Sequence, residues 1–229
     1  GEDVIYWHWS PEFQWEMNHQ VRGYNECLIL YILAASSPTH PVQANVYHEG
    51  WARGGAINTV AGQYGYVLRL RHNGAEEYGG PLFWAHYSYL GLDPRNLKDK
   101  YADYWTENVN QVLINWRWCT GNPGKHAGYS EDCWGLTASY SPSGYFAHRP
   151  GIESDMGVIS PTAALSSIPY TPDKSIAALR HFYYKLGGRI WGKYGFYDAF
   201  SIEKNWFPQR YLAIDQGPIP VMIENYRTG

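Results

Sequence analysis

Two segments of the chain carry a clear helical pattern of apolar residues. Residues 22–35 include the run NECLILYILAA, which is apolar nearly all round and predicts a buried helix. In residues 101–118, aromatic and aliphatic side chains recur three and four positions apart, which predicts a long helix. The dominant pattern along the chain is therefore helical.

Other helices are predicted from their start and stop signals. The segments SPTAALSSIP and TPDKSIAALRHFYYKLGG each place proline directly after a capping Ser or Thr, and the second ends in a glycine pair. Ser130 is expected to cap a helix that ends near Tyr140. A last helix over residues 214–227 is expected to be interrupted near Pro218 and Pro220.

Long loops rich in glycine and aromatic residues separate these helices. Within the loop over residues 53–80, the run GYVLRLR predicts one short strand. Long loops in a compact domain usually carry function. The pattern predicts an all-α fold of helical hairpins, and a length of 229 residues fits one domain over residues 1–229.

Composition and charge exclude several classes of protein. The net charge of −3 gives no basis for a nucleic-acid partner, and no apolar run reaches the roughly 20 residues of a membrane span. Cys27, Cys119 and Cys133 form no CxxC pair and no zinc pattern, so neither a metal nor another cofactor is expected. A bridge between Cys119 and Cys133 stays open, as does the oligomeric state.

The aromatic content points to a chemistry. The chain has 11 Trp, 21 Tyr and 7 Phe, together 17% of its residues. Trp and Tyr offer an apolar face with one polar group, which suits a sugar ring with its apolar C–H face and rim of hydroxyls. An aromatic-rich core is the alternative interpretation, and composition alone does not decide between the two.

Five stretches together resemble one known family. They are GYNECLILYILAASSPTHPV, GPLFWAHYSYLGLDP, SEDCWGLTASYSPSGY, ISPTAALSSIPYTPDKSIAALRHFYYKLGGRIWGKYGFYDAF and AIDQGPIPVMIENYRTG. These look like the glycoamylase-like domain of bacterial glucoamylase-like proteins, endo-β-1,2-glucanases and cyclic β-1,2-glucan synthases. The resemblance implies the C-terminal half of an (α/α)6 toroid with a cleft at one end. It also implies a β-glucan substrate, most plausibly β-1,2-linked, and a bacterial periplasmic or secreted location.

Three acids are the candidate catalytic groups, because glycoside hydrolysis normally uses two carboxyls on either side of the scissile bond. Glu26 enters the most apolar helix within GYNE, which matches the family, and suits a general acid. Glu131 follows Ser130, where a helix N-terminus would hold its carboxylate ionised. Asp198 lies among aromatic residues in YGFYDAF.

Each candidate acid also has a structural interpretation. Glu26, Glu131 and its neighbour Asp132 are ordinary first-turn acids, which stabilise a helix by roughly 0.3–1 kcal/mol. Asp215 and Glu224, in the last expected helix, are interpreted as structural partners of Arg or Tyr side chains.

A larger set of residues is expected to bind the sugar. Aromatic rings supply stacking platforms, while His and Asp side chains bond to hydroxyls; core packing is the alternative for each of them taken singly. Tyr87 is a further stacking candidate, and Arg149 or Arg53 a further donor. The expected set is Trp84, His86, Tyr129, Trp134, Tyr145, His148, Asp155 and Trp206.

The sequence therefore predicts a glycoside hydrolase acting on an oligo- or polysaccharide. Motifs of other enzyme classes, such as GxSxG, the P-loop, the Rossmann fingerprint and HExxH, are absent. Two alternatives remain open: a carbohydrate-binding or structural protein without catalysis, and a polysaccharide lyase on a similar toroid. The net negative charge argues mildly against the acidic sugar that a lyase requires.

Overall fold

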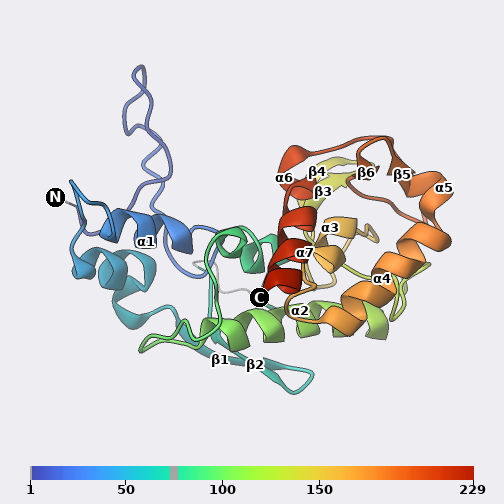
Figure 1. The fold of residues 1–229 in the computed structure, drawn as a ribbon, viewed down its shortest axis with the longest axis horizontal. Coiled ribbons are helices and arrows are strands. Elements are labelled where there is room, and N and C mark those ends of the chain that lie inside the picture. Colours follow the sequence, from blue (N-terminus) through green and yellow to red (C-terminus); the bar gives the residue numbers. More distant parts are fainter. Residues whose placement is uncertain (1, 73–76) are drawn as a thin grey trace.

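The computed structural model describes residues 2–72 and 77–229. Figure 1 shows the long helix α2 low in the view, with α3 and α7 above it and α1 on the other side of the molecule, an extended arm near the N-terminus, and α7 ending beside the middle of the molecule. Three short hairpins and several single helical turns connect the helices. The helices are α1 (Leu28–Ala35), α2 (Tyr104–Gly121), α3 (Pro161–Leu165), α4 (Pro172–Tyr184), α5 (Gly187–Ile190), α6 (Ala213–Gln216) and α7 (Pro218–Thr228).

The predicted helices are mostly present. Proline opens α3 and α4 as expected, and the last helix divides into α6 and α7 just before Pro218. The first predicted helix is shorter, because residues 22–27 are not helical. Gly23 N–H donates to the carbonyl of Trp51, and Tyr24 N–H donates to the carbonyl of Arg71, so this segment pairs with other loops.

The predicted helix over residues 130–140 is wrong. Ser130 and Cys133 close a turn through mutual backbone hydrogen bonds, and the chain then becomes extended. Gly135 has φ of 127°, which no helix accommodates, and a Cβ there would lie 2.9 Å from that of Ala163. Close packing against α3 therefore keeps this segment extended.

The all-α prediction holds only in part, because three antiparallel hairpins accompany the helices within residues 2–72 and 77–229. The predicted strand within GYVLRLR is confirmed as the second strand of the first hairpin. The other two hairpins were missed, since each strand is at most four residues long and gives little alternation to detect. The pairs are β1 (Asn58–Gln63) with β2 (Tyr66–Leu70), β3 (Ala138–Ser141) with β4 (Gly144–Ala147), and β5 (Trp191–Gly192) with β6 (Gly195–Phe196).

Two clusters of buried apolar residues form the core, and α2 contributes to both. Tyr104, at its start, belongs to the cluster around α1 and Trp51. Val112 and Trp118 belong to the cluster formed with α3, α4 and α7. Helix α2 therefore joins the two apolar clusters of the described residues.

A buried polar stripe on α2 fixes the loops around it. Glu107 accepts hydrogen bonds from the N–H groups of Arg69 and Leu70 in β2. Four residues on, Gln111 donates to the carbonyls of Gly79 and Pro81. After four more, Asn115 donates to the carbonyl of Leu136 and accepts from its N–H. The stripe lies on one helix face because residues four apart are neighbours.

Cys27, Cys119 and Cys133 are all free and buried, so the bridge left open by the sequence is not formed. None of the described helices is long and apolar enough to cross a bilayer.

Candidate active site

Three carboxyls from distant parts of the chain lie close enough to Tyr145 to act on it by their charge, and two of them also act on Tyr87. Glu26 lies in the turn before α1, Asp198 in the loop after β6, and Asp215 in α6. The charges of Glu26 and Asp215 both help to raise the pKa of Tyr87. The pKa of Tyr145 is raised by burial and by all three carboxyls. We call these five residues the carboxylate cluster.

Asp198 and Asp215 form a buried pair at the centre of this cluster. Their exposures are 0% and 1%. One oxygen of each is bound: Asp198 Oδ2 accepts from Tyr140 N–H at 2.9 Å, and Asp215 Oδ1 accepts from Tyr87 OH at 3.0 Å. The other two oxygens find no partner outside the pair among the described residues. The two carboxyls are close enough to hydrogen-bond to each other through a proton.

The pair carries one proton at neutral pH. Burial, and next the negative charge of Asp198, raise the pKa of Asp215 to about 8. Burial also raises the pKa of Asp198, but the Tyr140 N–H and the Arg210 guanidinium favour its ionised form. Two carboxyls at hydrogen-bond distance titrate together, so the pair keeps a single negative charge.

Glu26 is the third carboxyl, and it is only partly buried. Burial raises its pKa, while its own backbone N–H and the nearby His19 oppose that rise. The turn is fixed by Ser88, whose hydroxyl donates to the carbonyl of Glu26 and accepts from Ile29 N–H at 3.1 Å. Glu26 thus presents a carboxyl with a raised pKa on a rigid turn.

The loop before α6 holds Asp198 in place. Asp198 N–H donates to the carbonyl of Arg210, which joins this loop to the one after β6. The guanidinium of Arg210 lies 4.2 Å from the ring centroid of Tyr140. The same guanidinium favours the ionised form of the Asp198 carboxyl.

Glu131 does not join the cluster. It is exposed in the turn at residues 130–133, and its backbone carbonyl accepts from the Trp116 indole. No helix begins there, so the expected helix dipole is absent and the predicted ionised carboxylate loses its physical basis. Neighbouring Trp134 is fully buried and cannot be the proposed sugar platform.

Three more predicted sugar-binding residues lie in the core. Trp84 is 7% exposed and stacks on His72 with ring centroids 4.5 Å apart. His86 bonds to Ser167 Oγ at 2.9 Å, and burial lowers its pKa to about 3, so the ring is neutral. His148 is fully buried, and burial lowers its pKa to about 4. Here core packing, the alternative interpretation, applies, because all three residues are buried.

Asp155 and Tyr129 are hydrogen-bonded to each other and connect the loops that carry them. Asp155 is 5% exposed and accepts from Trp118 Nε1 at 2.8 Å, Tyr129 OH at 2.6 Å and Gly157 N–H at 3.0 Å. A carboxylate with three donors has little capacity left for a sugar hydroxyl. The remaining predicted residue, Trp206, is half-buried and pairs through its backbone with Ser201.

Of the predicted residues, the cluster thus contains Glu26, Asp198 and Tyr145. Tyr87 was predicted only as a further stacking residue, and Asp215 was interpreted as a structural partner of a Tyr or Arg. The bond from Tyr87 to Asp215 confirms that partnership, but the buried carboxyl pair adds chemistry that the sequence did not suggest. The available signal was an acid beside the helix break in AIDQGPIP.

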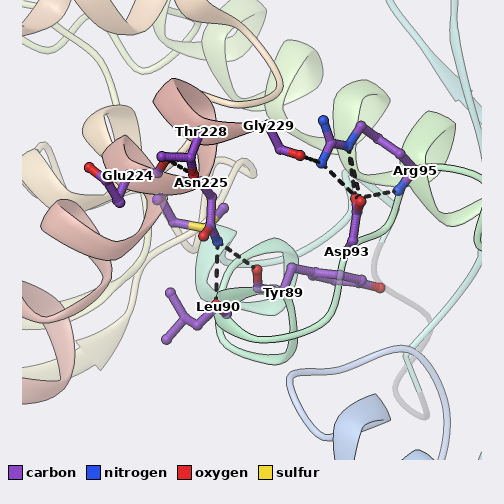
Figure 2. A network of polar contacts seen from close by, with 9 residues as sticks. Tyr89, Leu90, Asp93, Arg95, Glu224, Asn225, Thr228 and Gly229 are labelled. Carbon is purple, nitrogen blue, oxygen red and sulfur yellow. Dashed lines mark hydrogen bonds and ion pairs between the residues drawn. The ribbon is translucent and has the colours of Figure 1, made fainter.

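A cavity of about 380 Å³ lies elsewhere, between the segment after Ser88–Leu90 and α7. Figure 2 shows its polar groups bonded to one another. Arg95 pairs with Asp93 at 2.9 Å and with the carbonyl of Gly229, while Asn225 donates to the carbonyls of Tyr89 and Leu90. Its lining includes no residue of the carboxylate cluster, and it offers no pair of free carboxyls. Among the described residues, no group of His, Cys, Asp and Glu side chains is placed to hold a metal ion.

The chain is similar to known proteins over nearly its whole length. Residues 18–229 match the Glycoamylase family model, described as "Putative glucoamylase". An exo β-1,2-glucooligosaccharide sophorohydrolase (non-reducing end) of Parabacteroides distasonis is 44% identical over 237 residues, covering 98% of this chain and 33% of that protein.

Two solved structures share the fold. An endo-β-1,2-glucanase from Chitinophaga pinensis, in complex with sophorotriose and glucose, is 65% identical with a TM-score of 0.98. A "putative glucoamylase" from Bacteroides caccae is 59% identical with a TM-score of 0.96. Both matches cover 100% of this chain and 55% of the solved chain, so the present chain spans about half the length of these relatives.

Proposed function

Because the chain belongs to the glycoamylase family, we propose that it is part of a glycoside hydrolase that cleaves β-1,2-linked glucan. The observation that carries the proposal is the buried Asp198–Asp215 pair, in which each carboxyl keeps one oxygen without a partner outside the pair among the described residues, next to Tyr87. Glu26 lies close enough for its charge to act on Tyr87 and Tyr145, as Asp215 does. The names of the relatives support the substrate class. In this proposal the 229 residues form the C-terminal half of an (α/α)6 toroid.

The proposed chemistry assigns one task to each part of the cluster. Glu26, whose pKa is raised by burial, donates a proton to the departing glycosidic oxygen as the bond to C1 breaks. Water adds to C1, and its proton passes to the singly charged Asp198–Asp215 pair. Tyr87, bonded to Asp215, and Tyr145 border the place where the sugar would lie.

The exposed ring of Tyr145 suits contact with a sugar. It is 57% exposed and meets Tyr140 at a centroid distance of 5.8 Å with nearly perpendicular planes. Its phenolic group lies within the field of all three carboxyls, so a glucose unit stacked on the ring would lie beside them.

The rival function is a carbohydrate-binding protein without catalysis. Buried acids that share a proton cost stability, so a pure binding protein would gain from replacing them. We therefore favour the hydrolase, because a buried carboxyl pair of this kind is useful in a reaction that transfers a proton and has no use in binding alone.

The test uses the complete protein, including any part of it beyond these 229 residues. It is incubated with linear β-1,2-glucan and, as controls, with β-1,3- and β-1,4-glucans of similar length. We expect new reducing ends from the β-1,2-glucan alone. Binding of the glucan without any new reducing ends would support the binding protein and overturn the hydrolase.

A further inference from the structure

Residues 5–21 form a narrow arm that projects from the body, drawn in blue next to α1 in Figure 1. Its two sides are joined by backbone bonds, such as Trp7 N–H to the carbonyl of His19 at 2.8 Å and the mutual bonds of Ser10 and Gln14. The side chain of Gln20 donates to Tyr6 OH at 3.2 Å. The arm therefore has its own internal structure.

The arm displays an unusual number of large apolar side chains. Trp7 and Trp9 are each 52% exposed, and Phe13, Trp15 and Met17 are at least 55% exposed. Concentrations of exposed apolar surface usually mark binding sites. Polar residues lie between these apolar side chains: His8, Ser10, Glu12, Gln14 and Glu16.

One side of the arm leads to the carboxylate cluster. The ring of Trp7 meets the ring of His19 edge-on, with centroids 6.2 Å apart. His19 in turn lies close enough to Glu26 for its charge to act on that carboxyl. Trp9 follows Trp7 by two residues and is equally exposed.

We propose that Trp7 and Trp9 stack against glucose units of a glucan chain that extends outward from the carboxylate cluster. This inference rests on the proposed function, since it extends the same site. Trp7 contacts His19, whose charge acts on Glu26, and Trp9 lies two residues further along the arm, so the two indoles define the proposed path outward from the cluster. Indole faces beside polar side chains match the apolar face and hydroxyl rim of glucose. Trp15 contacts Tyr6 instead, at 5.8 Å, and does not belong to this path.

The test compares Trp7→Ala and Trp9→Ala with the control Trp15→Ala in the complete protein. Trp15 is the same residue type with similar exposure, 55% against 52%. For long β-1,2-glucan we expect each of the first two variants to raise KM by about fivefold to tenfold, and Trp15→Ala to leave it unchanged. For the shortest β-1,2-glucooligosaccharide that is cleaved, kcat and KM should not change in any of the three.

Two results would overturn the inference. One is an unchanged KM for long glucan in both path variants. The other is an equal change in all three variants together with a lower melting temperature, which would mean that the arm packs against protein.

Failure of the proposed function is recognised separately. If the unmodified protein cleaves no glucan, its migration in gels that contain β-1,2-glucan replaces the kinetics. Retardation that is lost in Trp7→Ala and Trp9→Ala but kept in Trp15→Ala supports the inference. Equal retardation of the four proteins, or none, contradicts it.

Discussion

Two buried polar regions of this molecule differ in how fully their side chains are hydrogen-bonded. On α2, Glu107, Gln111 and Asn115 bond to the backbone of the loops around them. In the carboxylate cluster, Asp198 and Asp215 are equally buried, yet each keeps one oxygen without a partner outside the pair among the described residues. Burial alone therefore does not separate a structural from a functional polar residue; the unused bonding capacity does.

The physical reason lies in the cost of burying polar groups. A buried carboxylate that accepts several N–H bonds recovers much of its lost hydration, and it stabilises the segment that supplies those bonds. A carboxyl pair that shares one proton recovers less. Burial raises the pKa of Glu107 to about 7 and that of Asp215 to about 8, so a raised pKa is common to both regions. Only the pair also keeps an oxygen without a donor from the surrounding residues, which leaves it able to exchange a proton near neutral pH. The first arrangement stabilises the fold, and the second provides a reactive group.

The largest expected effect comes from Glu26→Gln. An amide cannot donate a proton to the leaving oxygen, so kcat/KM for β-1,2-glucan should fall by about 10²- to 10⁴-fold. The melting temperature should stay close to that of the unmodified protein, because Glu26 is only partly buried and the turn is fixed by Ser88. Steady-state kinetics with a parallel melting curve check this, and an activity loss that merely follows unfolding would contradict it.

Substitutions in the polar stripe of α2 should lower stability, whereas Glu26→Gln should lower activity. Glu107→Ala leaves the N–H groups of Arg69 and Leu70 without an acceptor, so the free energy of unfolding should fall by about 2–4 kcal/mol. Glu107→Gln keeps one acceptor oxygen and should lose less. Denaturant unfolding measures both variants, and equal stabilities for the two would contradict the role of the accepted bonds.

The pH dependence of stability tests the shared proton of the carboxyl pair. The pKa of Asp215 is about 8 in the folded chain against 3.8 in the unfolded chain, so the folded state binds more protons between these values. Its contribution to stability is therefore complete below pH about 4 and is lost as the pH rises to about 8. Asp215→Asn should flatten part of this fall, and the rest remains because burial also raises the pKa of Glu107, to about 7. An unchanged slope in denaturant unfolding from pH 4 to 8 would argue against the shared proton.

Asp155→Asn should have a smaller and purely structural effect. The three donors of Trp118, Tyr129 and Gly157 then face an amide, whose oxygen accepts hydrogen bonds but whose NH₂ group does not. The loss should lower the free energy of unfolding by about 1–2 kcal/mol. Activity at a temperature where the variant is folded should be unchanged. A loss of kcat/KM in the folded variant would restore the sugar-binding role predicted from the sequence.

The sequence predicted the parts of the fold that carry strong local signals. The capping Ser or Thr before proline correctly placed the starts of α3 and α4, and the apolar pattern found α1 and α2. The helix predicted after Ser130 was wrong because a cap and two acids are also compatible with a turn, and the close approach of Gly135 to α3 is a tertiary contact. Short hairpins gave too little alternation to be recognised.

The sequence predicted the site residues whose neighbours in the chain indicate a role, and it missed the residue whose role depends on a distant partner. Glu26 and Asp198 were found because an acid among apolar or aromatic neighbours needs a reason. Asp215 was missed as a reactive group, since its meaning depends on Asp198, which lies 17 positions away in the chain. Trp84, His86 and Trp134 were placed in the cleft because composition does not distinguish a core ring from an exposed one.

The most direct test of the central claim compares Asp215→Asn with Glu131→Gln on linear β-1,2-glucan, with new reducing ends as the readout in the complete protein. Asp215→Asn should lower kcat/KM by about 10²- to 10⁴-fold, while Glu131→Gln, in an exposed turn, should stay within about twofold. The reverse outcome, with Asp215→Asn active and Glu131→Gln inactive, would show that the carboxylate cluster is not the active site.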